Sequence, residues 1–221
     1  MKDADVIESP FVPRSDGPPL ILASASPRRA ELLRVAGLPF EVHVADGAEA
    51  GVADRIRSAG RMGRDDPARY AIALALAKAE TVAADHPDRL VLGADTIVVL
   101  DGDVLEKPAS PDDAVRMLSR LQGRRHTVIT ALALLGGPGG PATCAESTEV
   151  EFLPLDAGSI RRYVATGEPL DKAGAYGIQG YGAMMVSRIA GCYFNVMGLP
   201  LARLGALLRG VAGEPAAGED A

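Results

Sequence analysis

Apolar and polar residues recur along this chain with two different spacings, and those spacings predict where helices and strands lie. The stretch 27–36 repeats apolar residues at helical intervals, with Ser26 as N-cap, Pro27 at the first helical position and Gly37 after the end. Other segments show the same helical intervals, and alternating or β-branched runs predict strands. Further helices are expected over 67–84, 111–122 and 156–167 and from Pro200 onward, and strands over 38–46, 90–100, 126–137, 142–155 and near 183–190.

Turn signals indicate how these elements follow one another. Asp101-Gly102 is a strong signal for a hairpin after the strand 90–100, and GGPGGP joins the next two strands as an antiparallel pair. Hairpins mixed with helices favour an α/β or α+β fold with a mixed sheet, in two lobes around a cleft, over a purely parallel sheet. We expect one domain over 20–211, because 1–19 and 212–221 have the small, charged, Pro-containing composition of disordered tails.

Composition and charge narrow the class of protein. The 221 residues are 48% hydrophobic, which is enough for a substantial core. No run approaches about 18 apolar residues, and the N-terminus is acidic and Pro-rich, so we expect a cytoplasmic protein with no membrane segment. The formal net charge of -6 argues against a nucleic-acid partner, which would require a basic face.

Cysteine and histidine are too sparse to indicate a disulfide framework or a metal site. Cys144 and Cys192 are far apart in the sequence, and we expect them to be ordinary buried thiols. The three histidines, His43, His86 and His126, lack the spacing of metal ligands. We expect them on the surface or in loops.

Two arginines at the start of the 27–36 helix raise the first question of function. Arg28 and Arg29 lie in the first turn, where the helix dipole is already positive and each cation costs roughly 0.3–1 kcal/mol. An anionic partner at this helix end would offset that cost. We therefore expect a negative group there.

Asp95 lies in the middle of an apolar strand, where an isolated carboxylate would be costly to bury. A structural Asp bonded to backbone amides or to an Arg would explain it. However, Gly93 permits close approach, and Glu106 and Lys107 follow the same hairpin. These neighbouring residues favour a catalytic or metal-binding role for Asp95.

Lys78 shares one face of the 67–84 helix with apolar residues. Snorkelling of its ammonium to solvent and a functional role explain this pattern equally well. If the fold brings Lys107, Arg28 and Arg29 to the same place, the four form a local cationic site in an acidic protein.

Four glycines lie close together between positions 174 and 182. They match neither the phosphate-binding P-loop nor the dinucleotide-binding pattern, so both assignments are unsupported. A turn-rich loop is one explanation. The interleaved Lys172, Tyr176 and Gln179 offer a charge, an aromatic face and an amide, as a ligand-binding loop would need.

Three longer motifs resemble those of the Maf family of nucleoside triphosphate pyrophosphatases, in order and over roughly residues 20 to 210. They are ILASASPRRAELLRVAGLPFEV, VLGADTIVVLDGDVLEKP and LDKAGAYGIQGYG. The resemblance implies an α/β fold like that of inosine triphosphatases, with an elongated mixed sheet, flanking helices and a deep cleft between two lobes. It also implies hydrolysis of a nucleoside triphosphate to monophosphate and pyrophosphate with a divalent cation, Mg²⁺ or Mn²⁺. A homodimer is compatible with it.

The resemblance assigns roles to particular residues. By it, Asp95 matches the family's proton acceptor, and Lys107 and Lys78 match basic positions near the phosphates. Glu49 falls where the family has an acidic metal-site residue, although Ala48 stands where a second carboxylate is often found.

Three further positions match those that separate subgroups of the family. Arg28, Thr96 and Gln179 are the set found in the subgroup that acts on dTTP and UTP, whereas the subgroup that acts on methylated GTP tends to have Trp, Gln and Glu. A triphosphate would also be the anion that Arg28 and Arg29 require.

The leading hypothesis is thus an enzyme that removes surplus or modified pyrimidine triphosphates. In it, Glu49 and Asp95 hold the metal, and Asp95 deprotonates a water that attacks the α-phosphorus. A nucleotide-binding regulator of cell division without turnover is the alternative, because the family takes its name from septum formation.

Overall fold

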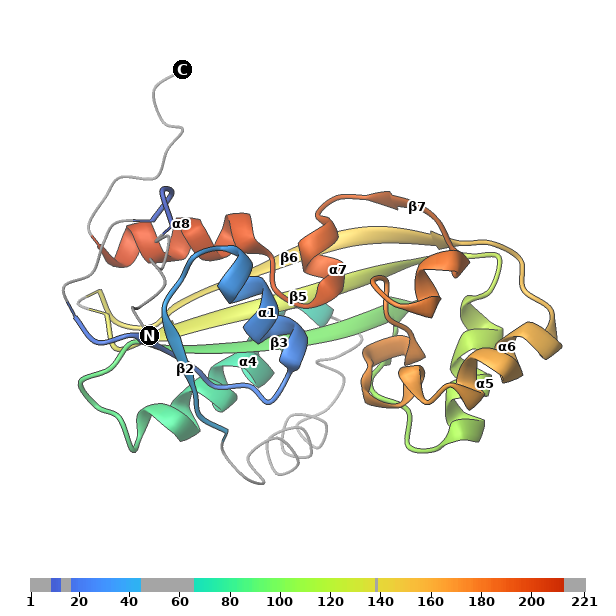
Figure 1. The fold of residues 1–221 in the computed structure, drawn as a ribbon, viewed down its shortest axis with the longest axis horizontal. Helices are drawn as coiled ribbons and strands as arrows, with labels where there is room; N and C mark the ends of the chain where they lie inside the picture. The colour runs from blue at the N-terminus through green and yellow to red at the C-terminus, as the bar shows by residue number, and fades with distance from the viewer. Residues whose placement is uncertain (1–8, 13–16, 45–65, 138, 213–221) are drawn as a thin grey trace, which may run out of the picture.

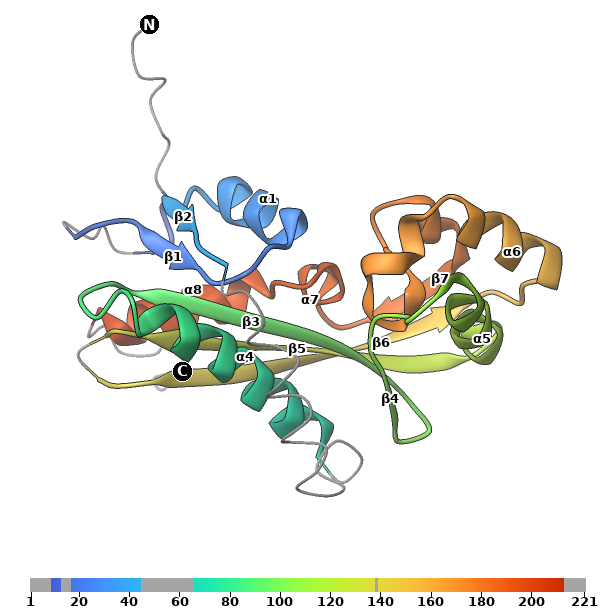
Figure 2. The same cartoon turned by 90° about the horizontal axis from the view of Figure 1, so that it is seen from below.

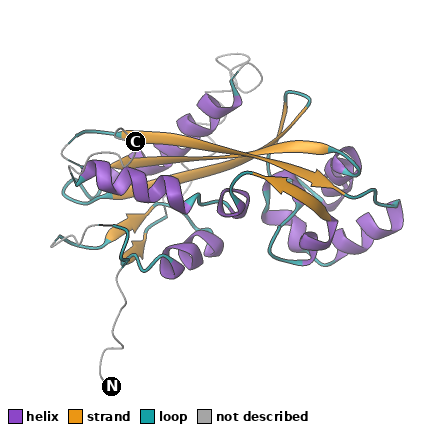
Figure 3. Ribbon diagram, turned by 90° about the horizontal axis from the view of Figure 1, so that it is seen from above, coloured by secondary structure: helices purple, strands orange, loops and turns teal. Residues whose placement is uncertain are grey.

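The structure is a computed structural model that describes residues 9–12, 17–44, 66–137 and 139–212. Within these residues a seven-stranded mixed sheet has the order β2-β1-β3-β5-β6-β7, and β4 pairs with β3. The long strands β3, β5 and β6 are antiparallel and run along most of the molecule (Figure 3). The strands are β1 (Leu20–Leu22), β2 (Phe40–Val42), β3 (Val91–Leu100), β4 (Asp103–Leu105), β5 (Arg125–Leu135), β6 (Ala142–Phe152) and β7 (Val186–Ala190).

Helices cover both faces of the sheet and one of its ends. Helix α4 packs on one face and α1 on the other (Figure 2), while α5 and α6 lie at the far end of the long strands (Figure 1). None of the helices in the described ranges is both long and apolar enough to cross a membrane. The helices are α1 (Pro27–Val35), α4 (Pro67–Ala83), α5 (Pro111–Leu121), α6 (Ala157–Ala165), α7 (Tyr193–Met197) and α8 (Leu201–Val211), and the 3-10 turns are η1 (Glu168–Asp171), η2 (Ala173–Ala175) and η3 (Tyr181–Met185).

The apolar core consists of three groups of side chains. One lies between the sheet and α4 and includes Leu74, and a second lies between the sheet, α1 and α8 and includes Leu33. The third, at the far end, packs Leu118 of α5 against Phe152 of β6. Both faces of one sheet are therefore covered near β1, whereas the far end has its own core. This arrangement confirms the mixed α/β fold in two lobes.

The expected elements are confirmed, with changes at their ends. The strand expected over 38–46 is limited to Phe40–Val42, and the segment near 183–190 begins as the turn η3 before it continues as β7. Helix α7 and the three 3-10 turns are absent from the sequence-based expectations, because each is only three to five residues long. Such short elements leave no periodicity to detect.

Of the two serines expected to cap helices α5 and α1, only the one before α5 does so. Ser110 caps α5 as expected, since its Oγ accepts a hydrogen bond from the amide of Asp113 at 3.2 Å. Ser26 precedes α1 in extended conformation, but its side chain makes no cap hydrogen bond. Its amide instead donates to Ser24 Oγ at 3.3 Å. The first turn of α1 therefore lacks the side-chain acceptor that the sequence predicts.

The division into tails and one domain stays a prediction. Of the tail residues, the structure describes 9–12, 17–19 and 212. Within them, the Ser9 amide donates to Gly37 O at 3.0 Å, and Arg89 Nη2 donates to Pro19 O at 2.6 Å.

Candidate active site

A cleft forms where, among the residues that the structure describes, one edge of β3 lacks a neighbouring strand. On this edge β1 pairs with β3 at positions 91 and 92, and β4 pairs with it from 98 to 100. Between them, no strand in the described part of the chain covers positions 93–97. Successive side chains of a strand point to opposite faces, so Asp95 and Thr96 at this gap are reached from both sides of the sheet. The cleft has a volume of about 280 Å³.

On the α4 side of the gap, Asp95 forms an ion pair with Lys78. The Lys78 Nζ lies 2.6 Å from Asp95 Oδ1, and the two side chains are only 12% and 13% exposed. Each charge offsets much of the cost of burying the other. The ammonium thus ends beside Asp95 in the cleft, which excludes snorkelling to the outer surface.

On the opposite side, Thr96 belongs to a chain of hydrogen bonds that starts at Arg29. Arg29 Nη2 donates to Thr96 Oγ1 at 3.1 Å, and Thr96 Oγ1 lies 3.0 Å from Thr130 Oγ1. Thr130 donates its own hydroxyl proton to the carbonyl of Asn195, so Thr96 is the donor to Thr130. The hydroxyl of Thr96 is therefore held in one orientation by its protein partners.

Arg29 is buried, and its guanidinium binds three separate parts of the protein. Besides Thr96, it donates through Nη1 to Ser24 Oγ at 2.8 Å and through Nε to Gly198 O at 2.9 Å. These bonds join the end of β1, the centre of β3 and the end of α7. Arg29 thus orients the walls of the cleft, a role that the sequence does not distinguish from that of Arg28.

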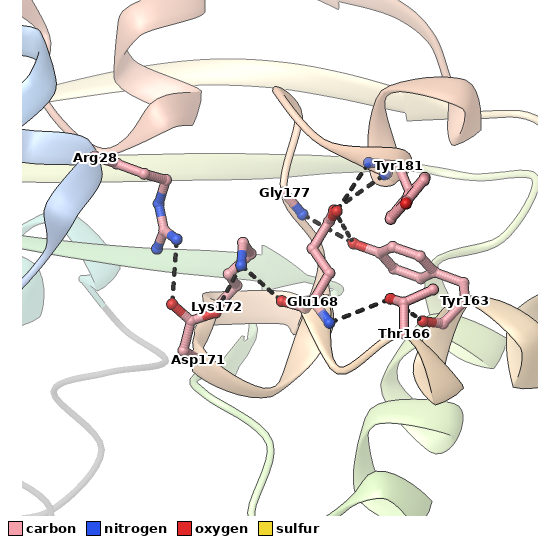
Figure 4. A network of polar contacts seen from close by, with 9 residues as sticks. Arg28, Tyr163, Thr166, Glu168, Asp171, Lys172, Gly177 and Tyr181 are labelled. Carbon is pink, nitrogen blue, oxygen red and sulfur yellow. Dashed lines mark hydrogen bonds and ion pairs between the residues drawn. The ribbon is translucent and has the colours of Figure 1, made fainter.

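Arg28, by contrast, meets an anion across the cleft. Its Nη1 lies 3.2 Å from Oδ2 of Asp171 in η1, and Lys172 Nζ lies 2.6 Å from Oδ1 of the same carboxylate (Figure 4). Burial opposes ionisation of Asp171, but Lys172 and Arg28 outweigh it and lower the pKa of the carboxyl. A negative group does lie at the start of α1, as the sequence predicts, and it comes from the other lobe.

The structure brings together all but one of the residues that the sequence selects. Lys107 and Gln179 complete the set, both exposed at the cleft wall. Glu49 lies outside the described residues. The residues from that set that line the cleft are Arg28, Arg29, Lys78, Asp95, Thr96, Lys107 and Gln179.

Two residues that the sequence did not select also shape the cleft. Asp171 lines it as the partner of Arg28, and Glu168 holds the loop that follows (Figure 4). Both precede the glycine cluster in the segment EPLDKAGAYG. The sequence does not mark acidic residues as part of a site that is expected to bind an anion. Only the fold shows that Asp171 and Glu168 orient cations and backbone amides.

The donor set of the cleft fits a divalent cation that binds together with phosphate. No group of three or more His, Cys, Asp or Glu side chains among the described residues is placed to hold a metal ion. However, Mg²⁺ in phosphate-binding sites is held by one or two carboxylates together with phosphate oxygens. Asp95 supplies one carboxylate, and the neighbouring cations would retain the phosphates.

His126 lies inside the protein, and the expectation of a surface or loop residue is wrong. It is 3% exposed in β5, and its Nε2 lies 2.8 Å from the hydroxyl of Tyr176, which lines the cleft. Phe152 packs against both rings at centroid distances of 4.8 and 4.7 Å. Burial lowers the pKa of His126 from 6.5 to about 4 and raises that of Tyr176. Both groups are therefore neutral near pH 7.

This burial predicts a loss of stability in mild acid. The unfolded chain takes up a proton at His126 near pH 6.5, but the folded protein resists it until about pH 4. Stability from this group is therefore full above pH 6.5 and falls as the pH decreases to 4, by up to about 3 kcal/mol. Urea unfolding at several pH values measures the change. His126→Gln should remove most of this slope between pH 6.5 and 4.5, and an equal slope in both proteins would contradict the prediction.

Comparison with known proteins gives similarities to one family, to characterised sequences and to solved structures. The family model described as Maf-like protein matches residues 19–211. The dTTP/UTP pyrophosphatase of Moorella thermoacetica is 53% identical over 190 residues, which cover 86% of this chain and 93% of that protein. The protein of the same name from Symbiobacterium thermophilum is 50% identical over 184 residues, covering 83% and 89%. Among solved structures, the Ham1 protein of Staphylococcus aureus is 16% identical with a TM-score of 0.48, covering 86% of this chain and 98% of that chain.

Proposed function

The chain belongs to the Maf family, and from this premise we propose that it hydrolyses dTTP and UTP to the monophosphate and pyrophosphate. Its relatives of about 50% identity are named for this activity. The proposal includes a cytoplasmic location, where such nucleotides are used. A homodimer stays a prediction.

One observation carries the proposal: a largely buried carboxylate and several cations share one cleft in an acidic protein. Asp95 and Lys78 lie on one side of the gap in β3, and Arg28 and Lys107 line the same cleft. A triphosphate needs several positive partners, and the first turn of α1 adds backbone amides and a favourable dipole. Phosphoryl chemistry therefore fits this cleft better than a neutral ligand does.

In the proposed reaction, Asp95 accepts a proton from the water that attacks the α-phosphorus. The bond from the α-phosphorus to the bridging oxygen breaks, and pyrophosphate leaves with the electron pair. Arg28, Lys78 and Lys107 stabilise the charge that develops on this leaving group. Lys78 also orients the carboxylate of Asp95 through their 2.6 Å contact.

Asp95, with Glu49 as the expected second carboxylate, would hold the divalent cation. When bound, Mg²⁺ or Mn²⁺ would polarise phosphoryl oxygens and neutralise part of their charge. The protein's own cations would still be required, because the triphosphate has more charge than one divalent ion can balance.

Arg28, Thr96 and Gln179 are the proposed specificity residues. The hydroxyl of Thr96 is fixed by Arg29 and Thr130, so it presents a constant surface to the ligand. Gln179 is exposed at the cleft wall, and its amide can both donate and accept a hydrogen bond. A uracil or thymine edge alternates carbonyl oxygens with an N–H group and would match that amide.

The test is a pyrophosphate-release assay over the common nucleoside triphosphates with Mg²⁺ or Mn²⁺. We expect kcat/KM for dTTP and UTP to exceed that for the purine nucleotides. Binding without turnover across the panel would instead favour the regulator, and preferred hydrolysis of purine nucleotides would contradict the assigned substrate.

Gln179→Glu should shift this preference. The carboxylate loses the N–H donor and faces a carbonyl oxygen of the base, so kcat/KM for dTTP and UTP should fall about 10-fold to 100-fold. GTP, whose ring edge offers N–H donors, should lose less. Parallel steady-state kinetics with dTTP, UTP and GTP measure the ratio, and an equal loss for all three would show that Gln179 does not contact the base.

A further inference from the structure

We propose that Glu168 is a positioning residue for substrate specificity, and that it sets the conformation of the loop that presents Gln179 to the base. This inference rests on the proposed function. Glu168 itself does not line the cleft, so it would act through the loop and not by contact with the nucleotide.

The carboxylate of Glu168 binds the loop immediately after Gln179. Its Oε2 accepts a hydrogen bond from the amide of Tyr181 at 2.8 Å, and its Oε1 accepts one from the amide of Gly182 at 3.1 Å. Figure 4 shows the side chain reaching from η1 toward this segment. One ionised side chain thereby fixes two consecutive backbone amides.

Tyr163 extends the same network to the residues before Gln179. Its hydroxyl donates to Glu168 Oε1 at 2.8 Å and accepts from the amide of Gly177 at 3.1 Å. Burial raises the pKa of Tyr163, so the phenol keeps the proton it donates. Glu168 and Tyr163 together hold the loop at 177 and at 181–182, on both sides of Gln179.

Two glycines of this loop lie in close contact with the same network, one beside Glu168 and one beside Tyr163. A Cβ at Gly180 would lie 2.5 Å from Glu168 Cδ, and one at Gly182 would lie 2.8 Å from the Tyr163 hydroxyl. Neither residue has a positive φ, so space and not backbone conformation requires glycine there. Two glycines of the cluster that matched no phosphate-binding pattern thus lie where the loop approaches Glu168 and Tyr163 closely.

The negative charge of Glu168 suits this task. Burial opposes its ionisation, but the amides of Tyr181 and Gly182 and the hydroxyl of Tyr163 outweigh that effect and lower the pKa of the carboxyl. Only a carboxylate offers acceptors on both oxygens. An amide must place its NH₂ group against the N–H of either Tyr181 or Gly182, so one backbone donor loses its partner.

The test compares Glu168→Gln with the matched variant Glu149→Gln, which changes a half-exposed glutamate on β6 paired with Arg125 at 3.5 Å. We measure KM and kcat for dTTP, and the inhibition constant of inorganic tripolyphosphate, which has no base. Glu168→Gln should raise KM for dTTP about 10-fold, equivalent to about 1.4 kcal/mol. The inhibition constant of tripolyphosphate should change less than about 2-fold, and Glu149→Gln should match wild type.

Tyr163→Phe is the second variant, and it tests the same network if Glu168→Gln does not fold. It removes the acceptor of the Gly177 amide and the hydroxyl donor to Glu168 Oε1, and it leaves both backbone bonds of Glu168 in place. It should raise KM for dTTP in the same direction, by a smaller factor, with tripolyphosphate inhibition again unchanged. A merely structural role would weaken both ligands together.

The possible results separate the two proposals. A wild-type protein that releases no pyrophosphate from dTTP overturns the proposed function. An active wild type with Glu168→Gln and Tyr163→Phe kinetics equal to those of Glu149→Gln overturns the role of Glu168. Equal weakening of dTTP and tripolyphosphate in a folded variant also overturns it.

Discussion

Asp95→Asn should lower kcat for dTTP hydrolysis by about 10³-fold or more, because the proposed general base can no longer accept the proton of the attacking water. The amide oxygen can still accept a hydrogen bond from Lys78, so the geometry of the 2.6 Å contact can persist without the negative charge. Nucleotide binding should change much less than turnover. Steady-state kinetics give kcat, and calorimetric titration of the variant with dTTP gives the Kd.

Asp85→Asn is the control for this substitution. Asp85 is exposed beyond the end of α4 and does not line the cleft. Its variant should keep wild-type kinetics. If Asp95→Asn retained more than a tenth of the wild-type kcat, Asp95 would be a structural partner of Lys78 and the base would have to be sought elsewhere in the cleft.

Gly93→Ala should strongly destabilise the protein. A Cβ at this position would overlap the carbonyl oxygen of Ala75 and lie 2.9 Å from both the Cβ and the amide nitrogen of Ala79. These atoms belong to α4, whose backbone cannot move without opening the core beneath it. We expect a loss of about 3 kcal/mol or more in the free energy of unfolding. Urea titration followed by circular dichroism measures it.

Because α4 carries Lys78, the same substitution should also reduce activity in the protein that remains folded. Gly139→Ala is the matched control, since a Cβ there meets nothing within 4 Å. Its unfolding free energy should stay within about 0.5 kcal/mol of wild type. A Gly93→Ala protein as stable as this control would mean that α4 does not press on β3 as closely as described.

The sequence alone determined the elements whose signal is local. Pro67 and the Ala-rich run define α4, Asp101-Gly102 defines the turn between β3 and β4, and Ser110 defines the start of α5. Each depends on the conformational preferences of residues that are close together in the sequence, so the sequence alone is enough to predict it. The motifs also selected the residues that line the cleft, through their resemblance to a family.

Only the tertiary structure decided what those residues do to one another. Arg28 and Arg29 are adjacent and chemically identical, yet one meets Asp171 across the cleft and the other is buried in bonds to Thr96 and the protein backbone. No local pattern separates them, because the partners that distinguish them, Asp171, Thr96 and Gly198, are 67 to 169 residues away in the chain.

The open edge of β3 shows the same division between sequence and structure. The sequence determined that an apolar strand contains Asp95, but among the described residues the pairing with β1 and β4 leaves that stretch uncovered and places it in the cleft. Likewise, the sequence determined a glycine cluster, and only the tertiary structure showed that Gly180 faces Glu168 and that Gly182 faces Tyr163. Local propensity determines the helices and strands, whereas long-range packing brings the charged side chains together. The chemistry of this protein depends on that long-range packing.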